Sequence, residues 1–222
     1  HDQINNTADF GALRVEFASA IESLVADFYP SQPVLLETVA DLVDAFIQQP
    51  LVASTSLINF VLMGKPGAGK TRLATTLAAV LGKLGLFVYD QLVVCGRSDF
   101  VAEYEGQTAV KSRNFLMGNL EKIIFLDEAY SLTTWDHSVG EPDRKLSAYS
   151  SEAVTEIVAF LSQRVGATCL IAAGYEEEML NDFIPSNPGL ERRLSNRVWL
   201  KDYTTEQLVG IYLTALAAAL SD

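Results

Sequence analysis

Hydrophobic residues recur every three or four positions in two stretches near the start of the chain. These stretches cover residues 10–28 and 35–48, and prolines follow each of them. This spacing predicts two amphipathic helices that end before the prolines. We expect both helices to pack against a larger domain rather than to carry chemistry, and we assign residues 1–53 to an N-terminal helical segment.

Beyond this segment the hydrophobic pattern changes to short, nearly continuous apolar runs separated by helical patterns. The runs are of strand length and are rich in β-branched and aromatic residues, which favours buried parallel strands over helices. The predicted strands cover residues 57–63, 92–96, 122–127, 168–173 and 197–200. Strands that alternate with helices indicate an α/β fold, and right-handed crossovers would bring the strand ends at Gly64 and Asp127 side by side.

The first predicted strand leads directly into a glycine-rich loop, and a helical pattern then runs as far as Leu84. The loop reads Gly-Lys-Pro-Gly-Ala-Gly-Lys-Thr over residues 64–71, the pattern of a phosphate-binding loop. Its glycines let backbone N–H groups point at phosphate oxygens, and the following helix adds its positive dipole end. Lys70 would reach the β- and γ-phosphates of ATP, and the Thr71 hydroxyl would ligate Mg²⁺. The nucleotide-binding candidates here are Gly64, Pro66, Gly67, Ala68, Gly69, Lys70, Thr71 and Arg72.

A second candidate motif follows the predicted strand at 122–127, where four apolar residues lead into Asp127 and Glu128. The Asp127 carboxylate would hold Mg²⁺ through its water shell, and Glu128 would orient and deprotonate the attacking water. Two acids at a strand end can also be a solvated terminus. Their pairing with Lys70 and Thr71 favours an ATPase site.

Composition narrows the class of partner and compartment. The chain has 222 residues, enough for one sizeable α/β core, and a net charge of −12 with a pI near 4.6, so we expect no nucleic-acid partner. Its two cysteines, Cys95 and Cys169, lie in apolar runs. This placement indicates buried thiols in the cytoplasm or another reducing, soluble compartment. The apolar tract over 208–220 is too short to span a bilayer, and we expect no membrane association.

Several further segments resemble one family when they are read together with the two motifs. They are residues 100–108, 129–132, 172–175, 186–194 and 202–204. In order and spacing they resemble the AAA+ ATPases of the CbbX type, a group that contains red-type Rubisco activase, stage V sporulation protein K and ATPases of mycobacterial type VII secretion. The resemblance covers residues 55–215.

The resemblance implies a P-loop NTPase fold of the AAA+ type, a three-layer sandwich with a five-stranded parallel sheet in the order 5-1-4-3-2. It places the nucleotide-binding core at residues 54–202 and the start of a helical lid at 203–222. The chain ends inside the first lid helix, before the family's further nucleotide-sensing arginine. We therefore expect either a fragment of a longer protein, which we favour, or an ATPase with a weakened grip on nucleotide.

The resemblance also implies a ring, usually a hexamer, with Mg·ATP at each subunit boundary. An arginine from the neighbouring subunit would complete the site, and the match falls on Arg193, with Arg192 as the adjacent candidate. A guanidinium supplied in this way offsets charge on the γ-phosphoryl group. Capping of a helix end is the alternative for both arginines. Tyr175 falls near the family's polar γ-phosphate sensor, although it could simply pack.

Tyr104, Glu105 and Gly106 align with the loop that lines the ring's central pore and grips a polypeptide. The family usually has an aliphatic residue where this chain has Glu105. A ring of carboxylates would favour a basic or polar substrate segment or would weaken threading, and the sequence leaves both open. Residues 133–151 are longer than the usual connection at this point, and we expect a mobile surface loop with a solvated His137.

Three hypotheses about function follow. The first is an ATP-driven motor that remodels or threads a protein substrate, whose identity the sequence does not give. The second is an ATP-gated oligomeric scaffold with little hydrolysis, which Glu105 and the incomplete lid support. The third is a small-molecule kinase, which the segments 127–130 and 187–193 argue against.

Overall fold

The structure is a computed structural model that describes residues 59–83, 87, 92–104, 106–133, 135–136 and 145–221. The helices expected over 10–28 and 35–48 lie outside these residues, as do Glu105 and His137.

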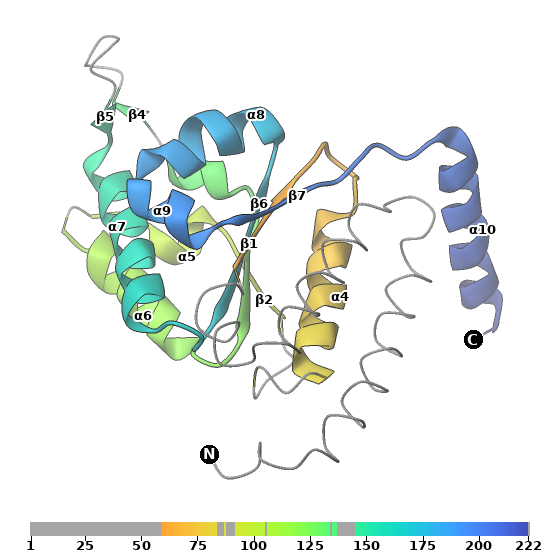
Figure 1. The fold of residues 1–222 in the computed structure, drawn as a ribbon, viewed down its shortest axis with the longest axis horizontal. Helices are drawn as coiled ribbons and strands as arrows, with labels where there is room; N and C mark the ends of the chain where they lie inside the picture. The colour runs from red at the N-terminus through yellow and green to blue at the C-terminus, as the bar shows by residue number, and fades with distance from the viewer. Residues whose placement is uncertain are drawn as a thin grey trace.

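A five-stranded parallel sheet forms the centre of the described part (Figure 1). Its strands are β1 (Phe60–Met63), β2 (Leu92–Cys95), β3 (Ile123–Leu126), β6 (Cys169–Gly174) and β7 (Asn196–Trp199). They lie in the order β2-β3-β6-β1-β7, which confirms the expected order 5-1-4-3-2. Each predicted strand is present, and the ends differ from the prediction by a few residues at most.

The two faces of the sheet are both covered, because alternate residues of each buried strand point to opposite sides. The parallel register places Phe60, Ile171 and Phe125 in one row that packs on the side of helix α4 (Lys70–Lys83). Val61, Ala172 and Leu126 form the matching row on the other side. The result is the three-layer sandwich that the resemblance implied.

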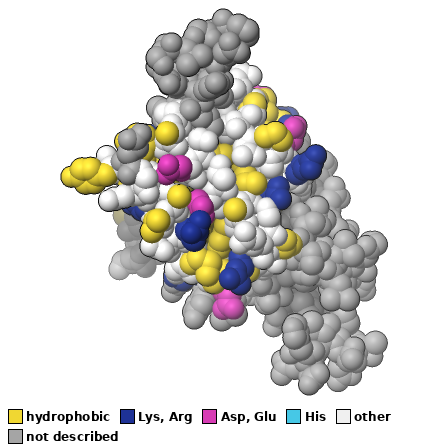
Figure 2. All heavy atoms as spheres, turned by 90° about the vertical axis from the view of Figure 1, so that its left-hand side faces the viewer, with side chains coloured by type: hydrophobic (Ala, Val, Ile, Leu, Met, Phe, Trp, Pro, Cys, Tyr) yellow, Lys and Arg dark blue, Asp and Glu magenta, His cyan; other side chains and the backbone are white. Residues whose placement is uncertain are grey.

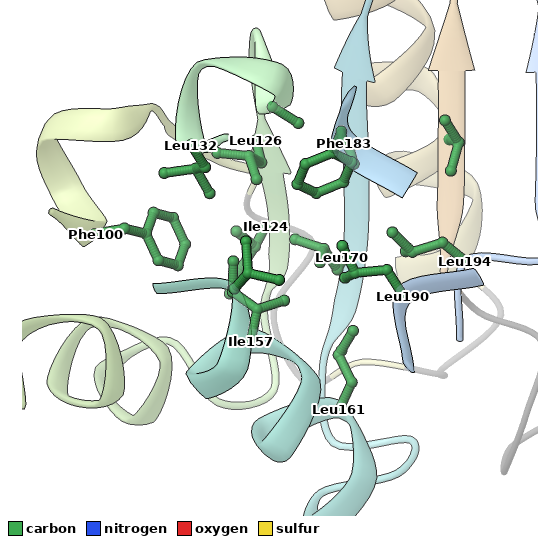
Figure 3. Packing of buried hydrophobic residues seen from close by; sticks show 14 of the residues in the cluster. Phe100, Ile124, Leu126, Leu132, Ile157, Leu161, Leu170, Phe183, Leu190 and Leu194 are labelled. Carbon is green, nitrogen blue, oxygen red and sulfur yellow. The ribbon is translucent and has the colours of Figure 1, made fainter. Parts of the chain in front are cut away.

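The second face carries the helices that connect the remaining strands (Figure 1). These elements are α5 (Arg97–Phe100), α6 (Thr108–Gly118), the 3₁₀ helix η1 (Ala129–Leu132), α7 (Ala148–Gln163), α8 (Glu176–Glu178), the π-helical η2 (Met179–Phe183), the 3₁₀ helix η3 (Ile184–Ser186) and α9 (Pro188–Arg193). Figure 3 shows how side chains from several of them meet over the sheet. Phe100, Leu132 and Ile157 are completely buried in this cluster.

The long connection over 133–151 was predicted as a surface loop, and this prediction is wrong at both ends. An antiparallel pair forms between β4 (Trp135–Asp136) and β5 (Lys145–Leu146). Helix α7 begins at Ala148, where the Ser147 hydroxyl accepts a hydrogen bond from the Ser150 backbone N–H at 3.3 Å. This side-chain cap satisfies one of the free N–H groups of the first turn and so starts the helix earlier than expected.

Helix α10 (Thr205–Ser221) follows β7 after a short segment and lies within residues 203–222, which we expected to begin a helical lid. It lies beyond α4 at one side of the molecule (Figure 1). Its apolar side chains at Leu208, Val209 and Leu213 are exposed. Among the described helices, none has the length and hydropathy needed to cross a membrane.

Both cysteines are buried and free, as the sequence predicted. Burial raises the pKa of the Cys95 thiol to about 12 and also raises that of Cys169, because the thiolate form loses its hydration. Both thiols therefore stay protonated at neutral pH and are poor nucleophiles.

Candidate nucleotide site

The glycine-rich loop joins the carboxyl end of β1 to the start of α4. Gly67 and Gly69 have φ angles of +77° and +91°, in the left-handed region that glycine adopts without strain. Gly64 donates its N–H to the Gly174 carbonyl at 3.2 Å, which ties the loop to the end of β6. A Cβ on Gly64 would lie 3.0 Å from the Leu200 carbonyl oxygen, a tight contact that favours glycine at this position.

Lys70 points back into the loop that precedes it. Its Nζ donates hydrogen bonds to the carbonyl oxygens of Gly64 at 2.7 Å and Lys65 at 2.9 Å. Burial lowers the pKa of Lys70, and the negative charges of Asp127 and Glu128 oppose that shift. Both carboxylates therefore act on Lys70 across space, so the two motifs found in the sequence face one site.

The acidic motif follows the end of β3. The Asp127 backbone N–H donates to the Cys95 carbonyl at 3.0 Å, and its Oδ1 accepts from the Glu128 N–H at 3.0 Å. Glu128 is exposed and has φ and ψ of 48° each, a left-handed conformation that costs a non-glycine residue about 1–2 kcal/mol. It is held there by η1, in which the Ser131 N–H donates to the Glu128 carbonyl at 2.7 Å.

The strand ends at Gly64 and Asp127 were expected to be side by side, and here the prediction needs correction. Strand β6 lies between β1 and β3 in the sheet, so the two ends share an edge but are separated by one strand. Tyr175, which follows β6, fills the position between them. The rule of right-handed crossovers correctly predicts that both strand ends lie at the same edge of the sheet. It does not tell which strands are neighbours, and β6 lies between β1 and β3.

An aromatic pair links the two motifs across this intervening strand. The Tyr175 ring centroid lies 5.4 Å from Lys70 Nζ, and the Tyr130 ring stacks on Tyr175 with centroids 5.5 Å apart. The pKa of Tyr130 is raised to about 12, first by burial and then by the Glu128 carboxylate. A Cβ on Gly174 would come within 2.8 Å of the Tyr130 ring and 2.7 Å of Met179 Sδ. The Ala-Gly-Tyr segment therefore needs its glycine to admit this pair.

The remaining loop residues differ in exposure. Ala68 is buried, while Pro66, Thr71 and Arg72 are exposed at the surface of the site. The pKa of Tyr203 is raised, because the effect of burial is larger than the opposing effect of the positive charge on Arg72. Lys65 also forms an ion pair with Asp202, which joins the loop to the segment that leads into α10.

Thr71 and Asp127 supply a hydroxyl and a carboxylate, which are ligands suited to Mg²⁺. Magnesium in nucleotide sites keeps several waters and binds substrate phosphates, so one or two protein ligands suffice. Within the described residues there is no group of three or more His, Cys, Asp and Glu side chains that could enclose a metal ion. The residues present therefore fit magnesium that is held together with phosphates.

Arg192 and Arg193 lie in the last turn of α9, a separate element that follows Tyr175 in the chain. Arg192 is exposed, and Arg193 Nη1 donates to the Gly189 carbonyl at 3.0 Å, which is a contact within its own helix. Asn187 caps this helix by accepting from the Gly189 N–H at 2.8 Å. A role for either arginine in a neighbouring subunit stays a prediction.

Tyr104 and Gly106 lie in the connection between α5 and α6, apart from the nucleotide site. The Tyr104 side chain is 68% exposed, and Gly106 has a φ of +78°. Figure 2 looks onto this side of the molecule, where hydrophobic side chains lie among basic and acidic ones. Tyr104 is therefore accessible at the surface, and its contact with a polypeptide stays a prediction.

Sequence reasoning missed two residues close to the site, Arg97 and Asp202. Arg97 Nη1 donates to the Ser131 carbonyl at 2.6 Å, and Asp202 forms an ion pair with Lys65. Asp202 belongs to a segment that carried the family resemblance, which was a weak signal. No local pattern pointed to Arg97, because its partner lies 34 positions away in the chain.

Comparison with known proteins agrees with this geometry. The profile of the AAA family, described as the ATPase family associated with various cellular activities, matches residues 60–197. This chain belongs to the AAA family. The match covers both motifs, α9 and most of the sheet of this AAA protein.

Relatives of this AAA protein include three whose names define the CbbX-type group. A CfxQ homologue of Cyanidium caldarium is 35% identical over 161 residues, covering 72% of this chain and 53% of the relative. The chloroplastic ribulose bisphosphate carboxylase/oxygenase activase of Cyanidioschyzon merolae is 34% identical, with 72% and 52% covered. The ESX-1 secretion system protein EccA1 of Mycobacterium tuberculosis H37Rv is 34% identical, with 72% and 27% covered. These relatives confirm the resemblance to CbbX-type AAA+ ATPases.

The chain spans about half the length of the first two relatives and about a quarter of EccA1. Among solved structures, a chain of the HORMA:CdnC:Trip13 complex of E. coli MS115-1 matches with a TM-score of 0.49 at 13% identity. That match covers 90% of this chain and 64% of the other.

Proposed function

We propose that this AAA ATPase binds and hydrolyses Mg·ATP at the boundaries of a ring oligomer and uses the energy to remodel or thread a protein substrate. One observation carries the proposal. The Tyr175 ring centroid lies 5.4 Å from Lys70 Nζ, and the ring stacks on Tyr130, which follows Asp127 and Glu128 closely in the chain. This arrangement supports a common site for binding phosphate, holding a metal and activating water.

The proposed chemistry begins with Lys70 leaving the carbonyls of Gly64 and Lys65 for the β- and γ-phosphate oxygens. Backbone N–H groups of the loop over 64–72 would hold the phosphates, and Thr71, together with Asp127 through the water shell, would hold the magnesium ion. The ion, when bound, neutralises charge on the phosphate oxygens. Glu128 orients the attacking water and takes its proton, while Tyr175 keeps its ring over Lys70.

The ring and its substrate are the wider part of the proposal. Arg193, with Arg192 as the alternative, reaches the nucleotide of a neighbouring copy, and the exposed Tyr104 contacts a polypeptide. We assign residues 54–202 to the nucleotide-binding core and residues from 203 onward to the lid. A reducing, soluble compartment fits the two buried free thiols. The alternative is an ATP-gated scaffold with little hydrolysis, and Glu105 in the substrate loop favours it.

Replacement of Glu128 by Gln tests the chemical step. The amide keeps the size of the side chain but cannot accept a proton, so turnover should fall by about 10²–10⁴-fold while ATP affinity stays the same. Phosphate release and calorimetric binding of Mg·ATP measure the two quantities. Lys70→Ala is the comparison variant, since it should lose binding itself. Full turnover in Glu128→Gln would refute the assignment of the base, and slow turnover in the unaltered chain at every concentration would favour the scaffold.

A further inference from the structure

The chain that leads from α5 to Tyr104 is hydrogen-bonded to the start of α6. Lys111 Nζ donates to the carbonyls of Ser98 at 2.6 Å and Val101 at 3.0 Å. The Thr108 hydroxyl accepts from the Ala102 N–H at 3.1 Å, which joins the two ends of the loop. A displacement of α5 would therefore move the end of the loop that precedes Tyr104.

At its other end, helix α5 is attached to the turn over residues 127–132, which contains Glu128 and η1 and is named the catalytic turn for the role proposed above. Arg97, the first residue of α5, donates from Nη1 to the Ser131 carbonyl at 2.6 Å. Ser131 belongs to η1, and its N–H is bonded to the Glu128 carbonyl. A guanidinium carries a permanent charge, so its hydrogen bond to a half-buried carbonyl is stronger than a neutral one.

Packing connects the same two elements. Phe100 of α5 and Leu132 of η1 are both completely buried in the cluster on this face of the sheet, together with Leu126 of β3 (Figure 3). Close-packed side chains transmit displacements because the interior leaves them little free volume.

The backbone of the catalytic turn is strained at Glu128, which favours a change of conformation. Glu128 holds a left-handed backbone conformation, so a change to an ordinary backbone conformation would relieve strain. Such a change would move the Ser131 carbonyl and with it Arg97. A groove of about 970 Å³ between α5 and α6, lined in part by Ala102, Gly106 and Val110, gives the loop room to respond.

We propose that Arg97 is a positioning residue that couples the nucleotide site to the Tyr104 loop through the Ser131 carbonyl. The proposal rests on the function proposed above, since it assumes that Glu128 and Tyr104 serve one reaction. It assigns Lys111 the corresponding role on the loop side of α5. Arg97 itself touches neither nucleotide nor substrate in this account.

A fluorescent label on the loop tests the coupling. Cys95 and Cys169 are buried, so Tyr104→Cys supplies a selectively reactive thiol for a maleimide dye. A non-hydrolysable ATP analogue with Mg²⁺ should change the fluorescence of the labelled chain. Adding Arg97→Ala should abolish that change while calorimetry shows analogue affinity within about twofold. Arg97→Lys should keep part of the response, because its ammonium group can still donate one bond.

The matched control is Arg113→Ala, which removes an ion pair between α6 and Glu156 of α7 without interrupting the proposed path. This variant should keep the full response. If Arg97→Ala does not fold, Arg97→Lys and Lys111→Met decide, and both should weaken the response. A full response in these variants would overturn the proposed coupling but not the proposed function. Analogue binding without any response in the labelled Tyr104→Cys chain would do the same. A parent that binds no analogue would overturn the proposed function as well.

Discussion

Tyr175 lies over the ammonium group of Lys70 and stacks on Tyr130, and we propose that this position gives it a part in nucleotide binding. The ring face attracts the lysine cation, and the stack fixes the ring in place. From the sequence, Tyr175 could equally be a sensor or a packing residue. The structure places its ring beside the phosphate-binding lysine, which favours a role in holding that lysine ready for phosphate.

Tyr175→Ala should weaken Mg·ATP binding about fivefold, since a partly exposed cation–π contact is worth about 1 kcal/mol. Tyr175→Phe is the matched control because it keeps the ring and loses only the hydroxyl, so its affinity should stay near that of the unaltered chain. Calorimetric titration measures both variants. An equal loss in Tyr175→Phe would transfer the effect to the hydroxyl, and no loss in Tyr175→Ala would remove the proposed role.

At the scale of elements, the end of β6 is the most constrained junction of the site. Gly174 accepts the Gly64 N–H and leaves no space for a Cβ between Met179 and Tyr130. The strand, the aromatic pair and the phosphate-binding loop therefore depend on one glycine.

Gly174→Ala should destabilise the fold by about 1–3 kcal/mol, because the added methyl group overpacks a buried position. It should also displace Tyr130 and lower ATP hydrolysis. Urea denaturation measures the free energy of unfolding. Gly118→Ala is the control, since a Cβ at Gly118 has no neighbour within 4 Å. Equal stability of Gly174→Ala and the unaltered chain would show that Met179 and Tyr130 relax without cost.

Local signals account for the elements that the sequence predicted well. The strands are nearly continuous apolar runs, α4 has a helical spacing of apolar residues, and the loop at 64–71 has a backbone that its glycines determine. Strand order came from the family resemblance, because periodicity does not tell which strands are neighbours. The start of α7 was missed because Ser147 was not recognised as a cap. The contact between Arg97 and Ser131 depends on how β2 and β3 pack, and no short stretch of sequence encodes it.

At the scale of the whole molecule, one chain carries the phosphate-binding loop and both acids. Its Arg193 lies at the end of α9, where its side chain donates to the Gly189 carbonyl of the same helix. Tyr104 and several apolar side chains of α10 are exposed. These features fit an enzyme whose site is completed by a second copy, which is the central claim of the proposed function.

A mixing experiment tests that claim most directly. Lys70→Ala cannot bind phosphate but keeps Arg193, and Arg193→Ala keeps the loop but lacks the arginine, so each chain should be inactive alone. Phosphate release by mixtures of the two is measured at constant total concentration and saturating Mg·ATP. The account predicts activity that appears on mixing and is greatest at intermediate ratios, because a neighbour's Arg193 then meets an intact loop. No activity at any ratio, with assembly of both variants verified by light scattering, would contradict an arginine acting between copies.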